Sequence, residues 1–327
     1  MFRAIPEELP RPVLALVAFL GTVSLLGAGP AGPTTVRAAK ITILSTMLAD
    51  WGVGEWGFSA LVEAYRKRLL FDTGAEPDTV IRNLQALGLD LSDVTDVALS
   101  HAHSDHVGGL AALRKALAAK SPRALTRVHV GKGFFTPRYR NGQLYTPLAA
   151  ERGTLEAGGV QFIEHAGPAE LLPGVWFTGP VPRIHPERNY PKDVLVDTPA
   201  GRVTDTVAED SSLVLDTKDG LVVLTGCGHA GVINTLEAAQ KVVRPAKVTT
   251  VIGGLHLFTA DDTTLEWTAA QFRRFGVREL VGAHCTGIEA VYRLRSQAGL
   301  NRKTAVVGAV GATWELGKGI DPGRLAR

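Results

Sequence analysis

The sequence predicts an α/β fold, and three observations support this prediction. Segments with the apolar pattern of strands alternate with segments of helical spacing in both halves of the 327-residue chain. Histidines stand at the ends of four predicted strands, which is where a layered α/β sheet collects functional groups. The sequence carries no glycine pattern of the dinucleotide-binding or P-loop type, so those two α/β folds are not indicated.

The first half of the domain is expected to open with three strands and then to alternate between helices and strands. A helix over 78–89 is indicated because Val80, Leu84 and Leu87 fall on one stripe. Gly88 supplies the stop of that helix. The expected strands cover 40–46, 58–65, 68–74, 94–101 and 126–135, and a second helix covers 110–120.

The second half resumes the alternation after a long irregular stretch. Residues 131–205 hold many of the prolines and scattered aromatics, with strand-like pieces at 160–165 and 174–179. A long irregular segment inside a compact domain is more often a functional loop or lid than a linker. Beyond it, strands are expected at 211–217, 220–226, 247–254, 279–284 and 303–309, and helices at 232–243, 264–275 and 287–297.

The composition describes an ordinary globular protein with enough length for one large core. Hydrophobic residues make up 45% of the chain and charged residues 20%, and the formal net charge is +3. The charges form no basic tract, and an isoelectric point near 8.9 does not change that picture. A nucleic-acid partner is therefore not expected.

The first 39 residues differ in composition from the rest. Two arginines precede an uncharged apolar run over 13–29, and small residues follow that run. Val36 and Ala38 have the spacing of a signal-peptidase cleavage site of the A-x-A type. This order predicts an export signal and a periplasmic or extracellular domain over 40–327. The alternatives are an uncleaved membrane anchor, because the run approaches the ~20 residues that span a bilayer, and a spurious extension. Contact with a membrane is expected only if 1–39 stays uncleaved.

A dense histidine cluster follows the strand predicted over 94–101. The segment LSHAHSDHVGG places His101, His103, Asp105 and His106 within six positions of a chain that has nine histidines. Side chains two residues apart on an extended strand project to the same face, so His101 and His103 point together. Imidazole nitrogens and a carboxylate are ligands for a borderline divalent metal such as zinc. The alternative is a set of solvated loop histidines.

Three histidines of the second half also stand at predicted strand ends. His229, His256 and His284 each follow a strand, which favours one metal site shared with the first cluster. The two cysteines of the chain, Cys227 and Cys285, are neighbours of these histidines in the sequence. Two cysteines make no disulfide framework, and two small buried thiols are favoured slightly over a pair formed in an oxidising compartment.

These motifs together resemble the metallo-β-lactamase superfamily. The resemblance covers roughly 40–315, rests on His-x-His-x-Asp-His preceded by LLFDTG, and implies a four-layer αβ/βα sandwich. It also implies that Asp72 supports the cluster by hydrogen bonds without binding metal. The ligands that it implies are His101, His103 and His229 for one metal and Asp105, His106 and His284 for a second.

One departure from the family pattern concerns the second metal position. The family usually places a bridging aspartate between the last two metal-binding histidines, and here His256 stands at about that place. Asp261 and Asp262 follow, but they are expected to cap the next helix. A two-metal site without that carboxylate is more positive, which suits a small anionic substrate such as a phosphate or diphosphate ester.

A narrower resemblance comes from four further motifs. They resemble the subgroup containing the dihydropterin synthase of methanopterin biosynthesis, which joins a dihydropterin diphosphate to a ribofuranosyl aminobenzene phosphate and releases diphosphate. Other members of the subgroup are described as metal-dependent hydrolases, and an export signal argues against an intracellular pterin pathway. The four motifs are FTGPVPR (177–183), GCGHAGVINT (226–235), GGLHL (253–257) and HCTG (284–287).

The resulting functional prediction is a metal-dependent hydrolase acting on an anionic, phosphate-containing small molecule. Asp105 is expected to orient the attacking water and pass on a proton, and His256 to donate a hydrogen bond to the anion. Arg183 is the predicted anion clamp, with an ordinary surface arginine as the alternative. Weaker candidates for the same role are Arg138, Arg140 and Arg188.

Two alternative functions stay open at this level. One is the diphosphate-releasing synthase of the subgroup, and the other is an exported metal-binding module without catalysis. One or two zinc ions are the expected cofactor, with manganese, iron and magnesium as alternatives. The sequence does not set the oligomeric state.

Overall fold

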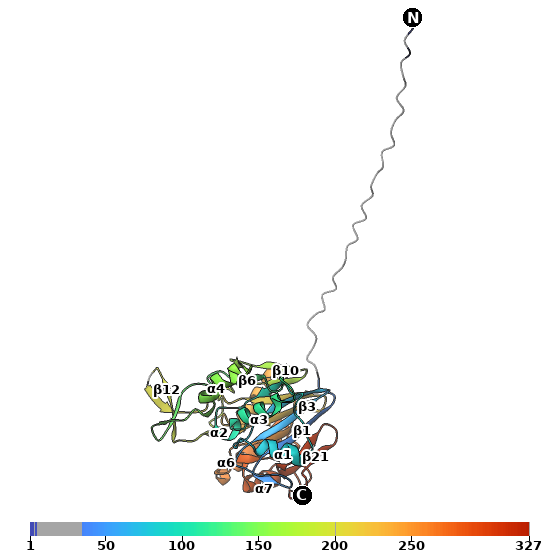
Figure 1. The fold of residues 1–327 in the computed structure, drawn as a ribbon. Helices are drawn as coiled ribbons and strands as arrows, with labels where there is room; N and C mark the ends of the chain where they lie inside the picture. Colours follow the sequence, from blue (N-terminus) through green and yellow to red (C-terminus); the bar gives the residue numbers. More distant parts are fainter. Residues whose placement is uncertain (3, 5–34, 200, 327) are drawn as a thin grey trace. The chain divides into compact units, whose positions relative to one another are not determined.

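The computed structural model describes residues 1, 2, 4, 35–199 and 201–326, and the compact unit covers Pro33–Arg327. Two large sheets form its centre (Figure 1). The first sheet contains, in spatial order, β21 (Gly319–Asp321), β20 (Thr313–Glu315), β1 (Ala39–Ser45), β3 (Ser59–Ala64), β4 (Lys67–Phe71), β5 (Asp96–Ala98), β6 (Arg127–Gly131) and β9 (Gln161–His165). The second contains β10 (Ala169–Leu172), β11 (Val175–Phe177), β14 (Ser212–Thr217), β15 (Gly220–Thr225), β16 (Val248–Gly253), β17 (Glu279–Gly282) and β18 (Ala305–Val307).

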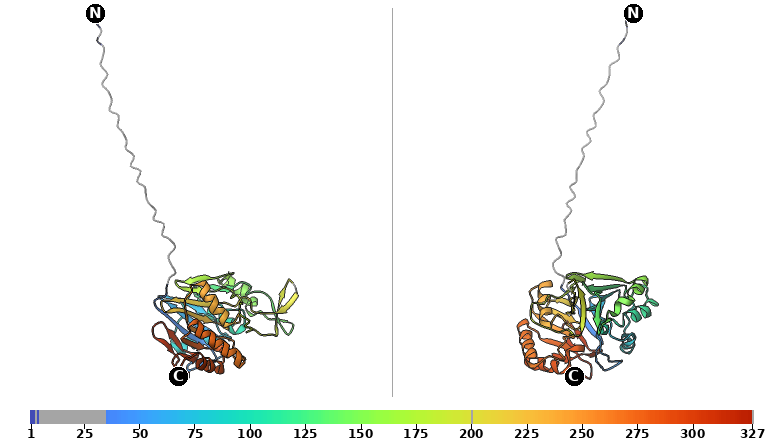
Figure 2. Two further views of the ribbon diagram at one scale, coloured as in Figure 1. Left: turned by 180° about the vertical axis from the view of Figure 1, so that it is seen from behind. Right: turned by 90° about the vertical axis from the view of Figure 1, so that its left-hand side faces the viewer.

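Helices cover the outer face of each sheet, and the two groups lie on opposite sides of the molecule (Figure 2). The first sheet packs against α1 (Thr79–Leu87), α3 (Leu110–Ala118) and α4 (Pro147–Ala157). The second packs against α5 (Val232–Val242), α6 (Asp262–Phe275) and α7 (Ile288–Gln297). This arrangement confirms the predicted four-layer αβ/βα sandwich.

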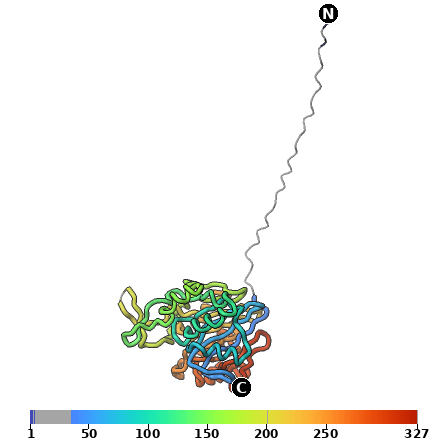
Figure 3. Tube along the Cα trace, viewed as in Figure 1, coloured from blue at the N-terminus to red at the C-terminus, as the bar shows by residue number. Residues whose placement is uncertain are grey.

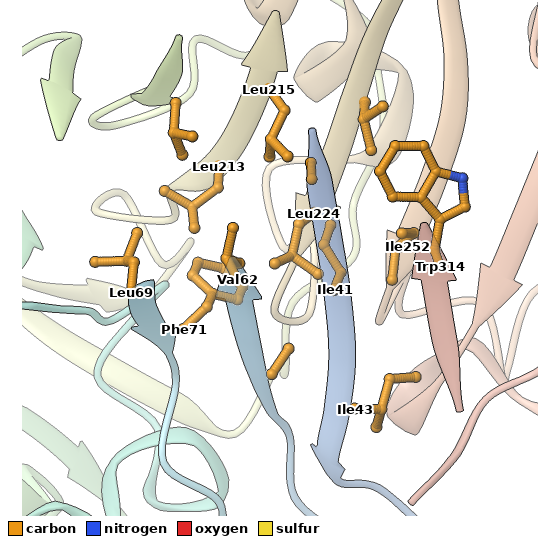
Figure 4. Packing of buried hydrophobic residues seen from close by; sticks show 14 of the residues in the cluster. Ile41, Ile43, Val62, Leu69, Phe71, Leu213, Leu215, Leu224, Ile252 and Trp314 are labelled. Atoms are coloured by element: carbon orange, nitrogen blue, oxygen red, sulfur yellow. The ribbon is translucent and has the colours of Figure 1, made fainter. Parts of the chain in front are cut away.

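The space between the sheets is filled by apolar side chains from both of them. Ile41 and Phe71 of the first sheet meet Leu213, Leu224 and Ile252 of the second, and all five are buried (Figure 4). Each such side chain contributes about 1.5–3 kcal/mol on leaving water. Successive side chains of β14 alternate between two apolar environments, because Leu213 and Leu215 face the partner sheet and Val214 faces the helices.

The strand and helix predictions agree with the structure to within a few residues at most element ends. Gly88 ends α1 in the left-handed conformation, with φ of 65°. Asp261 caps α6 through a hydrogen bond that it accepts from the Thr264 amide, as predicted. Two C-terminal strands, β20 and β21, were not predicted. β20 pairs with β1 and β21 pairs with β20, so strands from the two ends of the compact unit are neighbours in one sheet (Figure 3).

The segment 131–205 is more regular than the sequence predicted. It contains α4, an edge strand of the first sheet (β9) and two strands at the edge of the second sheet (β10 and β11). A four-stranded sheet is also present, with β13 (Gly201–Thr204), β12 (Val194–Thr198), β7 (Arg138–Arg140) and β8 (Gln143–Leu144) in that order. The apolar pattern missed α4 because Leu148 and Leu155 are its buried residues, two turns apart. The hairpin β12–β13 extends away from the two large sheets (Figure 1).

The predicted domain start at residue 40 lies inside the folded unit. Val36 is completely buried, and its amide donates to the Asp216 carbonyl at 2.6 Å. The short strands β2 (Leu48–Ala49) and β19 (Ala309–Val310) pair with each other in a separate two-stranded sheet. Among the described residues, no helix has the length and apolar character to cross a membrane, and the run 13–29 lies outside those residues.

Candidate metal centre

Loops that follow strands of both large sheets meet at one place. The loop after β5 supplies His101 and His103, and α2 (Ser104–Val107) supplies Asp105 and His106. The loop after β15 supplies His229, and the turn η1 (His284–Thr286) after β17 begins with His284. The structure therefore brings together all six predicted ligands.

A first group contains His101, His103 and His229. Their donor nitrogens lie within 4.8 Å of one another, and their ring centres are 4.6–4.8 Å apart. All three residues are buried, and each has an Nε2 atom without a hydrogen-bond partner among the described residues. Three buried, unpartnered nitrogens facing one another are unfavourable unless a cation lies between them, so the group fits a metal ion.

A second group lies beside the first and contains different donors. The ligand atoms of Asp105, His106, Cys227 and His284 lie within 4.8 Å of one another. Asp105 Oδ2 is 3.3 Å from His284 Nε2 and 3.9 Å from His106 Nε2. Asp105 is the partly exposed member, whereas the histidines and the thiol are buried. This donor set also fits a divalent ion.

Asp72 connects the two groups through hydrogen bonds. Its Oδ2 accepts a hydrogen bond from His106 Nδ1 at 2.7 Å and another from Ser100 Oγ at 2.7 Å. Its Oδ1 accepts from the Ser100 amide, and Ser100 Oγ lies 2.9 Å from His101 Nδ1. Asp72 is fully buried behind the donors, which is the supporting position that the sequence resemblance implied.

The segment 131–205 contacts the metal centre through Asn189. His229 Nδ1 donates to the Asn189 carbonyl, which leaves His229 Nε2 facing the first group. Asn189 Nδ2 also donates to the Leu255 carbonyl at 3.3 Å. The sequence analysis did not identify Asn189. Every residue has a backbone carbonyl, so this contact with His229 does not depend on the type of residue and cannot be recognised from the sequence.

Two buried carboxylates lie behind the histidine loops. Glu209 accepts a hydrogen bond from the Ala102 amide at 3.3 Å, and Asp210 accepts one from the Ala230 amide at 2.8 Å. Burial raises the pKa of each of these carboxyls to about 7. Arg138, a predicted anion binder, is instead buried in ion pairs with Asp205 and Glu209.

The charge states of the three imidazoles in the first group suit cation binding. Burial, together with the neighbouring imidazoles, holds the pKa of His101 and of His229 well below the ordinary value. Burial also lowers the pKa of His103, to about 4. These three rings are therefore neutral at pH 7, as metal ligation requires. Although burial opposes its charge, the carboxylates of Asp72 and Asp105 raise the pKa of His106 to about 9.

Three residues of the centre have a left-handed backbone without being glycine. Asp72, His256 and His284 have φ values of 54°, 49° and 46°. Such conformations require about 1–3 kcal/mol each and persist where surrounding contacts impose them. The His284 amide, for example, donates to Thr46 Oγ1 at 2.9 Å. The strain therefore marks the places where the chain turns to direct these side chains.

His256 lies at the junction of two cavities. One, of about 510 Å³, is lined by metal donors including His103, Asp105 and His284, and we call it the donor cavity. The other, of about 650 Å³, is lined by residues 186–190 and by the start of α6, and we call it the outer cavity. The two share Tyr190, His256 and Thr259. His256 Nδ1 is buried and has no hydrogen-bond partner in the described part of the chain.

The structure places Arg183 differently from the predicted anion clamp. Its Nη2 donates to the backbone carbonyls of Thr206, Val207 and His229, and Arg183 does not line the donor cavity. Arg140, a weaker candidate, does line it and stands over the Tyr145 ring. Arg183 was favoured because its turn lies in a family-like motif, but its guanidinium is used to hold the chain near His229.

The two cysteines are free and buried side by side. Their Sγ atoms are 3.2 Å apart, and Cys227 Sγ is 3.1 Å from His106 Nε2. The sequence interpretation favoured two buried thiols, which agrees with this state. It did not place Cys227 among the metal donors, although its position two residues before His229 was a usable signal.

Comparisons with known proteins agree with the fold and the centre. The model of the "Metallo-beta-lactamase superfamily" matches residues 57–240. The "7,8-dihydropterin-6-methyl-4-(beta-D-ribofuranosyl)-aminobenzene-5'-phosphate synthase" of Methanocaldococcus jannaschii is 28% identical over 77% of this chain and 88% of its own length. A second protein of that organism, the uncharacterized protein MJ0448, is 29% identical over 73% of this chain and 86% of its own length.

Solved structures show the same similarity. The crystal structure of Tm1679, described as "a metal-dependent hydrolase of the beta-lactamase superfamily", has a TM-score of 0.69 and 26% identity, covering 84% of this chain and 98% of that one. The metallo-β-lactamase fold protein YhfI of Bacillus subtilis has a TM-score of 0.51 and 16% identity over 85% and 99% of the two chains, which shows the fold alone.

Proposed function

This chain belongs to the metallo-β-lactamase superfamily and is an enzyme, and we propose that it is a metal-dependent synthase that joins two small molecules by displacing diphosphate. The pair of adjoining cavities carries this proposal. A synthase needs room for two substrates at one centre, whereas a hydrolase needs room for one substrate and water. The similarity to a named synthase supports the same reaction class.

The lining of the two cavities favours anionic substrates. Arg140 stands at the donor cavity, where its guanidinium also pairs with Asp193 at 3.0 Å. Arg188 and Lys192 line the outer cavity, and guanidinium and ammonium groups bind phosphate oxygens. The two carboxylates of its lining, Glu187 and Asp261, accept hydrogen bonds from backbone amides at the starts of α5 and α6. Trp267 lines the same cavity, and its indole can contact an aromatic ring of the substrate. The outer cavity therefore suits an aromatic molecule that carries a phosphate.

In the proposed reaction, the carbon–oxygen bond to diphosphate breaks with its electron pair on oxygen. The amine nitrogen of the second substrate forms the new carbon–nitrogen bond and gives up a proton. Divalent ions held by the two groups of ligands would act as Lewis acids and neutralise the charge of the phosphate oxygens. Asp105 orients the reacting amine and accepts its proton, and His256 donates a hydrogen bond to the departing diphosphate from the junction of the cavities.

The experiment is a two-substrate assay on the purified full chain. The protein is loaded with zinc, manganese or magnesium and given a dihydropterin methyl diphosphate with a ribofuranosyl aminobenzene phosphate. We expect diphosphate release that requires both substrates, with the condensed product seen by mass spectrometry. Trp267→Ala should raise the KM for the aminobenzene substrate. Phosphate or diphosphate release at an unchanged rate without the aminobenzene compound contradicts the synthase.

Hydrolysis of an anionic phosphate-containing molecule is the second candidate, favoured by the similarity to Tm1679. In that reaction water replaces the amine, so one oxygen of the product comes from solvent. Assays in ¹⁸O-labelled water separate the two reactions. Label in the alcohol or phosphate product indicates hydrolysis, and unlabelled condensed product indicates the synthase.

We propose that the chain is exported, on the basis of the apolar run 13–29, so that the synthase reaction would take place outside an intracellular pterin pathway. The burial of Val36 favours a mature chain that keeps this residue. N-terminal sequencing of protein from the native host tests the proposal. A start between 30 and 36 supports it, whereas Met1 on a soluble cytoplasmic protein contradicts it.

A further inference from the structure

The thiol of Cys227 lies among the donors of the second group. Cys227 follows β15 and is 2% exposed, and its Sγ is 3.1 Å from His106 Nε2. The nitrogen of His106 that faces it is the one left free by Asp72, which holds Nδ1 at 2.7 Å. Cys227 also lines the donor cavity together with Asp105 and His284. The sulfur therefore lies close to the donor atoms of three predicted ligands, at a place that the donor cavity reaches.

The spacing of these four donors matches a tetrahedral ion. At metal–ligand lengths of about 2.0–2.3 Å, tetrahedral ligand atoms lie about 3.3–3.8 Å apart. Asp105 Oδ2 and His284 Nε2 are 3.3 Å apart, and all four donors lie within 4.8 Å of one another. His284 is 1% exposed, and both of its ring nitrogens lack a hydrogen bond of good geometry. A buried unpartnered imidazole thus faces the same point as the thiol.

Charge gives a second reason for a sulfur ligand. Among the six ligands predicted from the sequence, Asp105 supplies the single negative charge to be shared by two dications. A Cys227 thiolate would add a second negative charge at the second group. A thiolate is also a soft ligand that favours zinc, cobalt and iron over magnesium.

We propose that Cys227 is a ligand of the second metal position, which completes an Asp105–His106–Cys227–His284 set and makes this position selective for thiophilic ions. The inference concerns the centre that the proposed function uses. It does not depend on which reaction that centre catalyses. Its test uses no substrate, so its failure is distinguishable from failure of the synthase proposal.

Cys285 provides a matched control. It is 1% exposed, and its Sγ lies 3.2 Å from that of Cys227, so the two thiols share the same surroundings. Cys285 groups with Cys227 and His256 and not with Asp105, His106 and His284. Because the chain has two cysteines, each single serine variant leaves one thiol. Any sulfur-to-metal signal in a variant is then assigned without ambiguity.

The test is the absorption spectrum of cobalt-substituted protein. The full chain is stripped of metal with a chelator and titrated with Co²⁺ under reducing conditions. We expect a thiolate-to-cobalt charge-transfer band as the second equivalent binds. Cys285→Ser should keep this band, whereas Cys227→Ser should lose it and bind the second equivalent more than tenfold more weakly. Magnesium should fail to displace the second cobalt.

Several outcomes overturn the proposal. They are a wild-type protein with two cobalt ions and no charge-transfer band, a Cys285→Ser variant without the band, and a Cys227→Ser variant that keeps it. The visible d–d absorption of the first cobalt reports that each variant is folded. If Cys227→Ser fails to fold, the Cys285→Ser variant still decides the question, because Cys227 is then its single thiol.

Discussion

The two halves of the metal centre differ in the donors they use and in how those donors are held. The first half is three buried imidazoles with unpartnered Nε2 atoms, collected from loops of both sheets. The second half mixes a partly exposed carboxylate, two imidazoles and a thiol. Members of both halves line the donor cavity, His103 and His229 from the first and Asp105, Cys227 and His284 from the second. The comparison indicates that both halves face the substrate space, and that they differ in the charge and softness of their donors.

The positions of the supporting side chains follow the same division. Asp72 contacts His106 directly at 2.7 Å but reaches His101 only through Ser100. The first half also depends on the Asn189 carbonyl, which comes from the segment 131–205. The two positions should therefore respond separately to substitution, and the following predictions test that separation.

The largest expected effect is on the first half. His103→Ala removes one of three imidazoles, so we expect loss of the first metal equivalent and of nearly all activity. The second equivalent should remain bound. Metal analysis after dialysis measures both, with Lys120→Ala, an exposed surface change, as the control. Retention of both equivalents would disprove the ligand role of His103, and loss of both would show that the two halves are not separable.

His256 should act on substrate more than on either ion. Loss of a hydrogen-bond donor to a developing anion typically lowers turnover by ~10²–10³. His256→Ala should show that reduction in kcat with metal content unchanged, and His256→Asp should weaken inhibition by inorganic phosphate. Loss of an ion from the alanine variant would make His256 a ligand. Unchanged turnover would make it structural.

Asp72 should stabilise the second half more than the first. Removing a hydrogen-bonding partner of a metal ligand lowers metal affinity by about 10–100-fold. Asp72→Asn keeps the size of the side chain but removes its charge, so the second equivalent should weaken by that factor and the first by less. Competition with a chromophoric chelator measures both constants. If Asp72→Asn weakened the binding of both metal equivalents by the same factor, Asp72 would not support the second half more than the first.

The smallest expected effect is a pH dependence from Asp210. Burial raises the pKa of this carboxyl to about 7, above its unfolded value of 3.8. Its contribution to stability is therefore fully present below pH 3.8 and is lost as the pH rises through 7. In metal-free protein, Asp210 by itself should lower the free energy of unfolding by up to about 1.4 kcal/mol per pH unit in this range. Asp210→Asn should therefore make the loss of stability between pH 5 and pH 7 smaller than in the wild-type protein, as measured by urea titrations at both pH values. An unchanged loss of stability would contradict this contribution.

The sequence was sufficient for the features that depend on local pattern. The strand and helix periods gave the alternating elements, and the spacing of His101, His103, Asp105 and His106 indicated a metal site before any contact was known. Histidines at later strand ends extended that site, because strands of one sheet end at a common edge. These signals lie within a few residues of one another or follow from sheet geometry.

Tertiary structure alone decided which distant groups meet. Arg183 binds three backbone carbonyls, Asn189 orients His229, and Cys227 stands 3.1 Å from His106, although 121 positions separate those two residues. None of these contacts has a period or a local motif, because each results from the packing of loops from two sheets. The sequence therefore determined the type of centre, and the packing of the two sheets determined its donors and its cavities.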